Sequence, residues 1–148
     1  MHTSIETTYV LLRLDKATYV LNGAYVREVT RWRAPTMVPG APALMPGIIN
    51  HRGVIMPVVD MRLLMHMAES PPDRATRYMM IHLDDIEAAF LVDSVIDLIN
   101  LSDTTVEPLP TAIDPQRSRF LKGVIRIAQE PLGLLDLPAI MESLLSKA

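Results

Sequence analysis

An internal duplication constrains the fold of this chain more than any other feature. A shift of 69 residues aligns 9–15 with 78–84 without a gap, with Tyr first and Asp last in both. A shift of 76 residues then aligns Gly47 with Gly123. A repeat this long exceeds a solenoid unit, so it predicts two similar lobes.

The start of each half predicts a β-hairpin. The runs 8–14 and 17–21 are rich in β-forming residues and are split by Asp15-Lys16, and the runs 77–83 and 86–92 are split by Asp84-Asp85. Four prolines between 35 and 46 exclude a helix interior there and predict an extended loop. The short runs 26–32 and 95–101 can be strands or a helical turn, because periodicity does not distinguish the two in runs this short. The stretches 47–50 and 53–59 in the first half have counterparts at 120–127 and 131–135 in the second half.

A short helix is predicted at the end of each half. Asp60 precedes 61–67 and Asp136 precedes 137–145, and an aspartate can cap the free N–H groups of a helix start. The second helix carries an apolar stripe, expected to be buried, with an exposed partner-binding stripe as the alternative: Ile140, Met141, Leu144 and Leu145. We predict a single domain over residues 8–146. The linker 68–75 divides it into two approximate lobes, 8–67 and 76–146, and the two lobes can exchange strands.

Composition narrows the function classes. The chain has 148 residues, 49% of them hydrophobic, a net charge of −3 and no cysteine. Disulfides, thiol chemistry and cysteine zinc sites are therefore excluded. The mild acidity argues against nucleic acid as a partner, because phosphate binding needs a clustered basic stripe. The N-terminus lacks the apolar region of a signal peptide, and long apolar runs are absent, so we expect a cytoplasmic protein without membrane insertion.

Motifs for catalysis are missing from the sequence. The six glycines form no GxGxxG or Walker loop, there is no GxSxG elbow, and the four histidines form no HExxH pair. Asp84 and Asp85 suit a solvated turn better than acid–base catalysis. Trp32, between Arg31 and Arg33, can stack a ligand, but it fits better as an edge residue that shields the core. We predict no catalytic residue, no metal and no cofactor.

The segment 47–62 is the most informative one. It reads Gly-Ile-Ile-Asn-His-Arg-Gly-Val-Ile-Met-Pro-Val-Val-Asp-Met-Arg. The turn Asn-His-Arg-Gly lets Asn50 and Gly53 adopt positive φ while Arg52 projects sideways. This string resembles the signature of the CheW-like family, and so do further segments in order over about residues 8–146: the opening hairpin, 26–29, 38–42, 91–95 and 135–136.

The resemblance implies a fold and a function. The fold is mainly β, with two SH3-like five-stranded β-barrel lobes around a shared core, short helices and a C-terminal helix. The function is that of a non-enzymatic adaptor, without cofactor, between the cytoplasmic tip of a chemoreceptor and the regulatory domain of a CheA-type histidine kinase. Partner contacts are expected at Val26, Gly47, Ile48, Asn50 and Arg52, whereas Pro46 and His51 depart from the residues usual in the family.

Apolar neighbours on both sides of Glu28 and Arg52 predict that these two charges form a structural ion pair. Alternatively, Arg52 contacts the partner directly. Two other functions remain open at this point: an SH3-like peptide-binding module outside chemotaxis, and an enzyme whose site is assembled from Arg52, Glu28 and His51.

Overall fold

The computed structural model describes residues 5–146. They form eleven strands, three short to medium α-helices and one 3-10 turn. In chain order these are β1 (Glu6–Leu14), β2 (Ala17–Asn22), η1 (Gly23–Tyr25), β3 (Val26–Arg31), β4 (Thr36–Met37), β5 (Gly47–His51), β6 (Val54–Asp60), α1 (Met61–Leu64), β7 (Arg77–Leu83), β8 (Ile86–Val92), β9 (Ser94–Ser102), α2 (Pro115–Ser118), β10 (Leu121–Ile127), β11 (Glu130–Leu135) and α3 (Leu137–Ser146).

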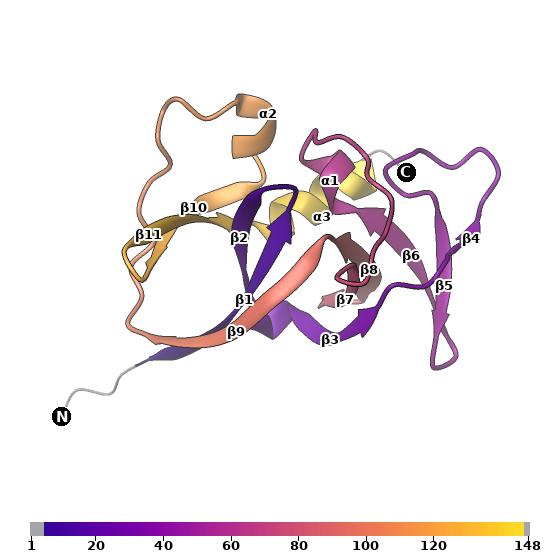
Figure 1. The fold of residues 1–148 in the computed structure, drawn as a ribbon, viewed down its shortest axis with the longest axis horizontal. Helices are drawn as coiled ribbons and strands as arrows, with labels where there is room; N and C mark the ends of the chain where they lie inside the picture. The colour runs from indigo at the N-terminus through magenta and orange to yellow at the C-terminus, as the bar shows by residue number, and fades with distance from the viewer. Residues whose placement is uncertain (1–4, 147–148) are drawn as a thin grey trace.

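The strands form two sheets that exchange their hairpins. One sheet has the order β10-β11-β2-β1-β9, and the other has the order β3-β7-β8-β6-β5-β4. The hairpin β1–β2 from the first half thus lies with β9–β11 from the second, and the hairpin β7–β8 lies with β3–β6 (Figure 1). In each sheet one parallel strand pair joins the two halves of the chain, β11 with β2 and β6 with β8. The mainly β fold class is confirmed, with a sixth strand in the second sheet because the two-residue β4 adds to β5.

The predicted hairpins are confirmed at both turns. Asp15 and Asp84 adopt positive φ, 55° and 54°, a conformation that aspartate tolerates better than most residues. The two runs that periodicity could not assign are strands, β3 and β9, and η1 supplies a helical turn just before β3.

Gly47 and Gly123 occupy equivalent places in the two sheets. Each lies in a strand that meets a short incoming segment, β4 for Gly47 and the isolated bridge between Glu107 and Val124 for Gly123. A Cβ atom on Gly47 would collide with the carbonyl oxygen of Thr36, and one on Gly123 with that of Glu107. The close backbone approach explains why both repeats carry glycine at this point.

The aspartate caps form as predicted, but the helices differ in extent. Asp60 accepts hydrogen bonds from the backbone of Arg62 at 3.0 Å and of Leu63 at 3.4 Å, and Asp136 accepts one from Ala139 at 3.1 Å. Helix α1 ends at Leu64 instead of 67, and α2 was not expected from the sequence. Leu145 is a correction to the buried stripe, because it is 59% exposed while the other three stripe residues are buried. Within the described residues no helix is long and apolar enough to cross a membrane.

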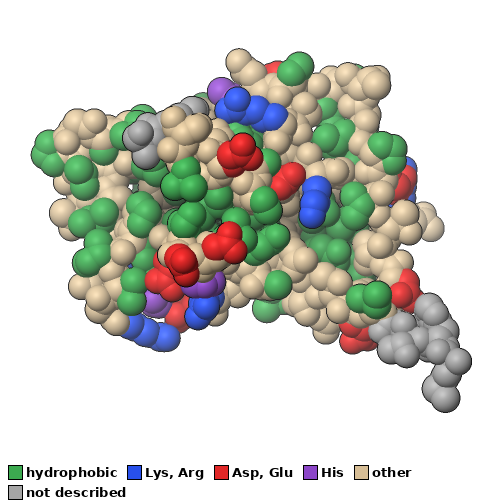
Figure 2. All heavy atoms as spheres, turned by 180° about the vertical axis from the view of Figure 1, so that it is seen from behind, with side chains coloured by type: hydrophobic (Ala, Val, Ile, Leu, Met, Phe, Trp, Pro, Cys, Tyr) green, Lys and Arg blue, Asp and Glu red, His purple; other side chains and the backbone are tan. Residues whose placement is uncertain are grey.

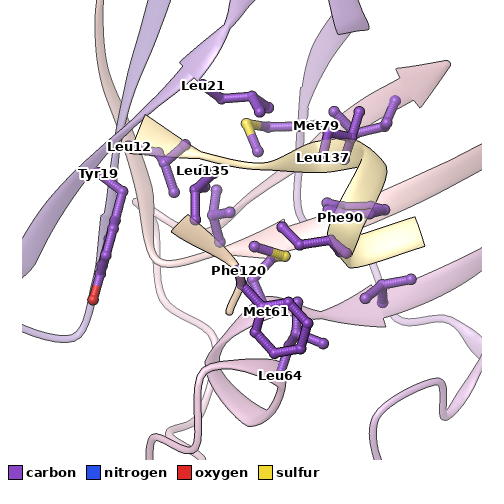
Figure 3. Close-up of a cluster of buried hydrophobic side chains, with 14 of the residues drawn as sticks. Leu12, Tyr19, Leu21, Met61, Leu64, Met79, Phe90, Phe120, Leu135 and Leu137 are labelled. Carbon is purple, nitrogen blue, oxygen red and sulfur yellow. The ribbon is translucent and has the colours of Figure 1, made fainter. Parts of the chain in front are cut away.

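The buried apolar residues form three clusters. The largest joins residues from both halves, including Leu12, Met79, Phe90, Phe120 and Leu137 (Figure 3). A second cluster belongs to the sheet that contains β5 and β6, and a third belongs to the sheet that contains β10 and β11. The fold therefore has one shared core and a smaller core within each sheet.

A buried ion network also connects the halves. The side chain of Arg62, 4% exposed, places Nε 3.3 Å from Asp60 Oδ1 and Nη1 3.1 Å from Asp93 Oδ1. Its Nη1 also donates to the backbone oxygen of Ser70 at 2.8 Å. One guanidinium thus ties α1, the linker between the halves and the junction of β8 with β9.

Candidate partner-binding site

The hairpin β5–β6 ends in a tight two-residue turn. His51 pairs with Val54 across the hairpin, and the two residues between them, Arg52 and Gly53, adopt φ of 53° and 85°. Such paired positive values match the right-handed twist of the flanking strands. The expectation for Asn50 was wrong: its φ is not positive, and its side-chain oxygen instead accepts the Gly53 N–H at 2.9 Å.

Glu28 on β3 binds this hairpin through both carboxylate oxygens. Its Oε1 lies 2.9 Å from Nη2 of Arg52, and its Oε2 lies 2.7 Å from Nε2 of His51. The structure therefore brings together Glu28 and Arg52, and it adds His51 to the same carboxylate. The Arg52 side chain is 76% exposed, whereas that of His51 is 14% exposed.

A second tie joins the segment after β3 to the same hairpin. Arg33 donates from Nη2 to the backbone oxygen of Asn50 at 2.6 Å. The hydroxyl of Tyr78 on β7 donates to the backbone oxygen of Arg33 at 2.7 Å, and burial raises the pKa of Tyr78 to about 12. Tyr78 therefore stays a neutral donor at physiological pH, and the hairpin is held against β3 and β7.

The pKa of Glu28 is lowered from its ordinary value. The main cause of the lowering is the hydrogen bond from His51. Desolvation by burial acts in the opposite direction and raises the pKa, whereas the charge of Arg52 lowers it further. A lowered folded-state pKa means that the contact stabilises the fold above the ordinary glutamate pKa of about 4.3 and that this stability is lost as the pH falls through the folded value. Acid therefore weakens the Glu28 contact between β3 and the hairpin, whereas the hydrogen bond from Arg33 to Asn50 does not depend on that carboxylate.

We expect His51→Phe to raise the pKa of Glu28 toward its ordinary value, because it removes the largest favourable cause while keeping an apolar ring. Carbon-13 NMR titration of the glutamate carboxyl groups measures this directly. Arg52→Gln serves as the matched comparison and should raise the pKa less, because its charge acts from an exposed position. An unchanged pKa in His51→Phe would contradict the hydrogen bond.

The predicted contact residues differ in their exposure. Val26 is half-buried and packs against the shared core cluster. Gly47 is buried under Thr36. Ile48 and Asn50 share the other side of β5, where they pair with Pro57 and Ile55 of β6. We call Ile48, Asn50, Ile55 and Pro57 the outer face.

The outer face has apolar members that sequence reasoning missed. Ile55 is 57% exposed, and Pro57 lines an apolar groove of about 110 Å³ beside α3, together with Met45 and Leu145. Figure 2 shows hydrophobic side chains on the left, where β4–β6 lie in this view, and across the centre of the same face. The period-2 alternation of β6 was the available signal, because Met56 and Val58 face the second core cluster and leave Ile55 and Pro57 on the opposite side. Contiguous exposed apolar surface of this kind is typical of protein–protein contact.

The comparisons agree on one family. The family model described as CheW-like domain matches residues 8–145. The chain is 26% identical to chemotaxis protein CheW of Bacillus subtilis (strain 168) over 133 residues, which cover 90% of this chain and 85% of that protein. It is 28% identical to the probable chemotaxis protein CheW of Rhizobium etli over 141 residues, 94% of this chain and 90% of that protein.

A solved structure shares the fold. The crystal structure of scaffolding protein TtCheW from Thermoanaerobacter tengcongensis superposes with a TM-score of 0.80 at 23% identity, over 89% of this chain and 90% of that one. Since the family model spans nearly the whole length of the chain, the chain belongs to the CheW-like family.

Proposed function

We propose that this protein is a non-enzymatic adaptor that couples the cytoplasmic tip of a chemoreceptor to the regulatory domain of a CheA-type histidine kinase. The observation that carries the proposal is the CheW-like match over residues 8–145. It is supported by relatives that are named chemotaxis proteins and by a neighbour that is named a scaffolding protein. These partners assign the protein to the cytoplasm.

The outer face is the surface that we assign to one of these partners. It is held in place by the tight turn and by the bonds from Glu28, so its geometry exists before a partner binds. Ile55 supplies an exposed apolar anchor, the groove beside α3 continues the apolar surface, and Asn50 and Arg52 lie at its polar rim. This arrangement of an apolar centre with a polar rim suits a helix or strand of a partner protein.

Affinity capture with crosslinking in the native cell tests the adaptor function. We expect a CheA-type kinase and a chemoreceptor among the captured proteins. Recovery of neither would overturn the function, whatever surface is used.

Substitution of Ile55 by Glu tests the surface. We expect the affinity for the captured kinase or receptor to fall by about tenfold or more, because the anchor becomes charged, with little change in melting temperature because the side chain is exposed. Leu98→Glu is the matched control, since Leu98 is 61% exposed on β9 of the other sheet and should keep wild-type affinity. Val26→Glu is less informative, because Val26 also packs against the shared core. Wild-type affinity in Ile55→Glu for both partners would overturn the surface and leave the adaptor function intact.

The two other functions from the sequence make different predictions. A peptide-binding module outside chemotaxis would bind extended peptides and capture no kinase. An enzyme with Arg52, Glu28 and His51 in its site would need a carboxylate available to substrate, whereas Glu28 already uses one oxygen on His51 and the other on Arg52. This pairing favours a structural role for the three residues.

A further inference from the structure

Three arginines line one pocket at the C-terminal end of β3. Arg31 and Trp32 come from β3 and the residue after it, and Arg74 and Arg77 come from the turn and the strand that begin the second half. The pocket has a volume of about 440 Å³. We call Arg31, Arg74, Arg77 and Trp32 the arginine patch, and it shares no residue with the outer face.

Two of these cations are placed directly opposite each other. Arg31 pairs with Arg77 in the antiparallel ladder of β3 and β7, so both side chains leave the same face of the sheet. Like charges in directly opposite positions destabilise a sheet. The net charge of the whole chain is −3, so this pair of arginines is a local positive region in an acidic protein.

No carboxylate in the described part of the chain forms an ion pair with the patch. Every ion pair within 4.0 Å among residues 5–146 involves other cations. Asp73 lines the same pocket, but its Oδ1 accepts the Ala75 N–H at 2.8 Å and so serves the turn. The three arginines and Asp73 together leave a local charge of about +2 around the pocket.

The guanidinium of Arg77 is also fixed in place. Its Nη1 donates to the backbone oxygens of Arg74 at 2.7 Å and Thr76 at 2.9 Å. Both acceptors use the same nitrogen, which leaves the other N–H groups of Arg77 free to donate. Trp32 packs against the second core cluster and gives the pocket an apolar wall.

We propose that the arginine patch binds a carboxylate-rich segment of a partner protein. A guanidinium fork matches a carboxylate through two parallel hydrogen bonds, and two adjacent forks of equal charge match two neighbouring acidic side chains. A polyanion such as nucleic acid fits less well, because the patch is short and the rest of the protein is acidic. The inference is independent of the proposed function, because it names neither a kinase nor a receptor and uses other residues.

Arginine side-chain NMR with a tetraglutamate peptide as the probe tests the proposal on the full chain. At low ionic strength we expect the Nε–Hε signals of Arg31 and Arg77 to shift on titration, and the shifts to shrink at about 0.15 M salt, where charges are screened. Tripolyphosphate forms the second arm. Binding of tripolyphosphate tighter than that of the peptide would overturn the carboxylate assignment, and equal shifts at all exposed arginines would overturn the site.

Arg31→Glu should change peptide binding and protein stability in opposite directions. It should weaken peptide binding by about tenfold or more, and it should raise the melting temperature by about 1–3 °C because a repulsive cross-strand pair becomes an attractive one. Arg31→Gln is the neutral second variant and should follow with smaller changes. Arg27→Glu, on the same strand but outside the patch, should leave peptide binding unchanged. Unchanged binding in Arg31→Glu, or a lower melting temperature, would overturn the proposal.

Discussion

Replacing Arg62 with methionine should lower the free energy of unfolding by about 3–5 kcal/mol, because it leaves buried carboxylates without their cation. Asp60 and Asp93 have side chains only 6% and 13% exposed, so water replaces little of the lost interaction. The linker also loses its hydrogen bond at Ser70. Equilibrium denaturation in urea measures the change.

Arg126→Met is the matched control for this prediction. Arg126 lies 2.8 Å from Glu107, but the two side chains are 56% and 39% exposed, and such surface pairs contribute only about 0–1 kcal/mol. Arg62→Lys should be intermediate, because a lysine keeps the charge but cannot reach both aspartates with a planar fork. Similar losses in Arg62→Met and Arg126→Met would show that burial does not set the cost.

The order of strands and turns was largely predictable, because local patterns determine it. Period-2 runs, Asp at positive-φ turns and Asp before each final helix all act within a few residues of the chain. The pairing of strands was not predictable to the same degree. The parallel contacts of β2 with β11 and of β6 with β8 join residues far apart in sequence, and no local signal reports which hairpin lies in which sheet.

The candidate site shows the same division. Isolated charges between apolar neighbours indicated that Glu28 and Arg52 need partners, and the chain folds so that they meet. His51 adds a contact to the same carboxylate, whereas the sequence had grouped it with Glu28 and Arg52 only as an alternative enzyme site and not as part of the structural ion pair. Arg62 was also missed: an arginine after a capping aspartate reads as a surface residue, and only the fold shows it buried.

The exchanged hairpins lead to the largest expected effect, which is loss of folding when the halves are separated. A fragment 1–70 keeps β1–β2 but loses β9 and β11, its neighbours on both sides, and it keeps β6 but loses β8. A fragment 71–148 loses the complementary strands. Each fragment is also short for independent stability, because a chain of about 70 residues buries a small core.

We therefore expect each fragment alone to give poorly dispersed amide NMR spectra and no near-ultraviolet circular dichroism, and an equimolar mixture to recover both signals. The shared core explains the recovery, since Leu12, Met79 and Phe120 come from different fragments and meet in one cluster. The full chain with a cleavage site engineered in 68–75 is the control, and it should stay folded after cleavage. A dispersed spectrum from either fragment alone, at a concentration where it is monomeric, would show that a half of this chain holds a complete folding unit and would contradict a single domain over 8–146.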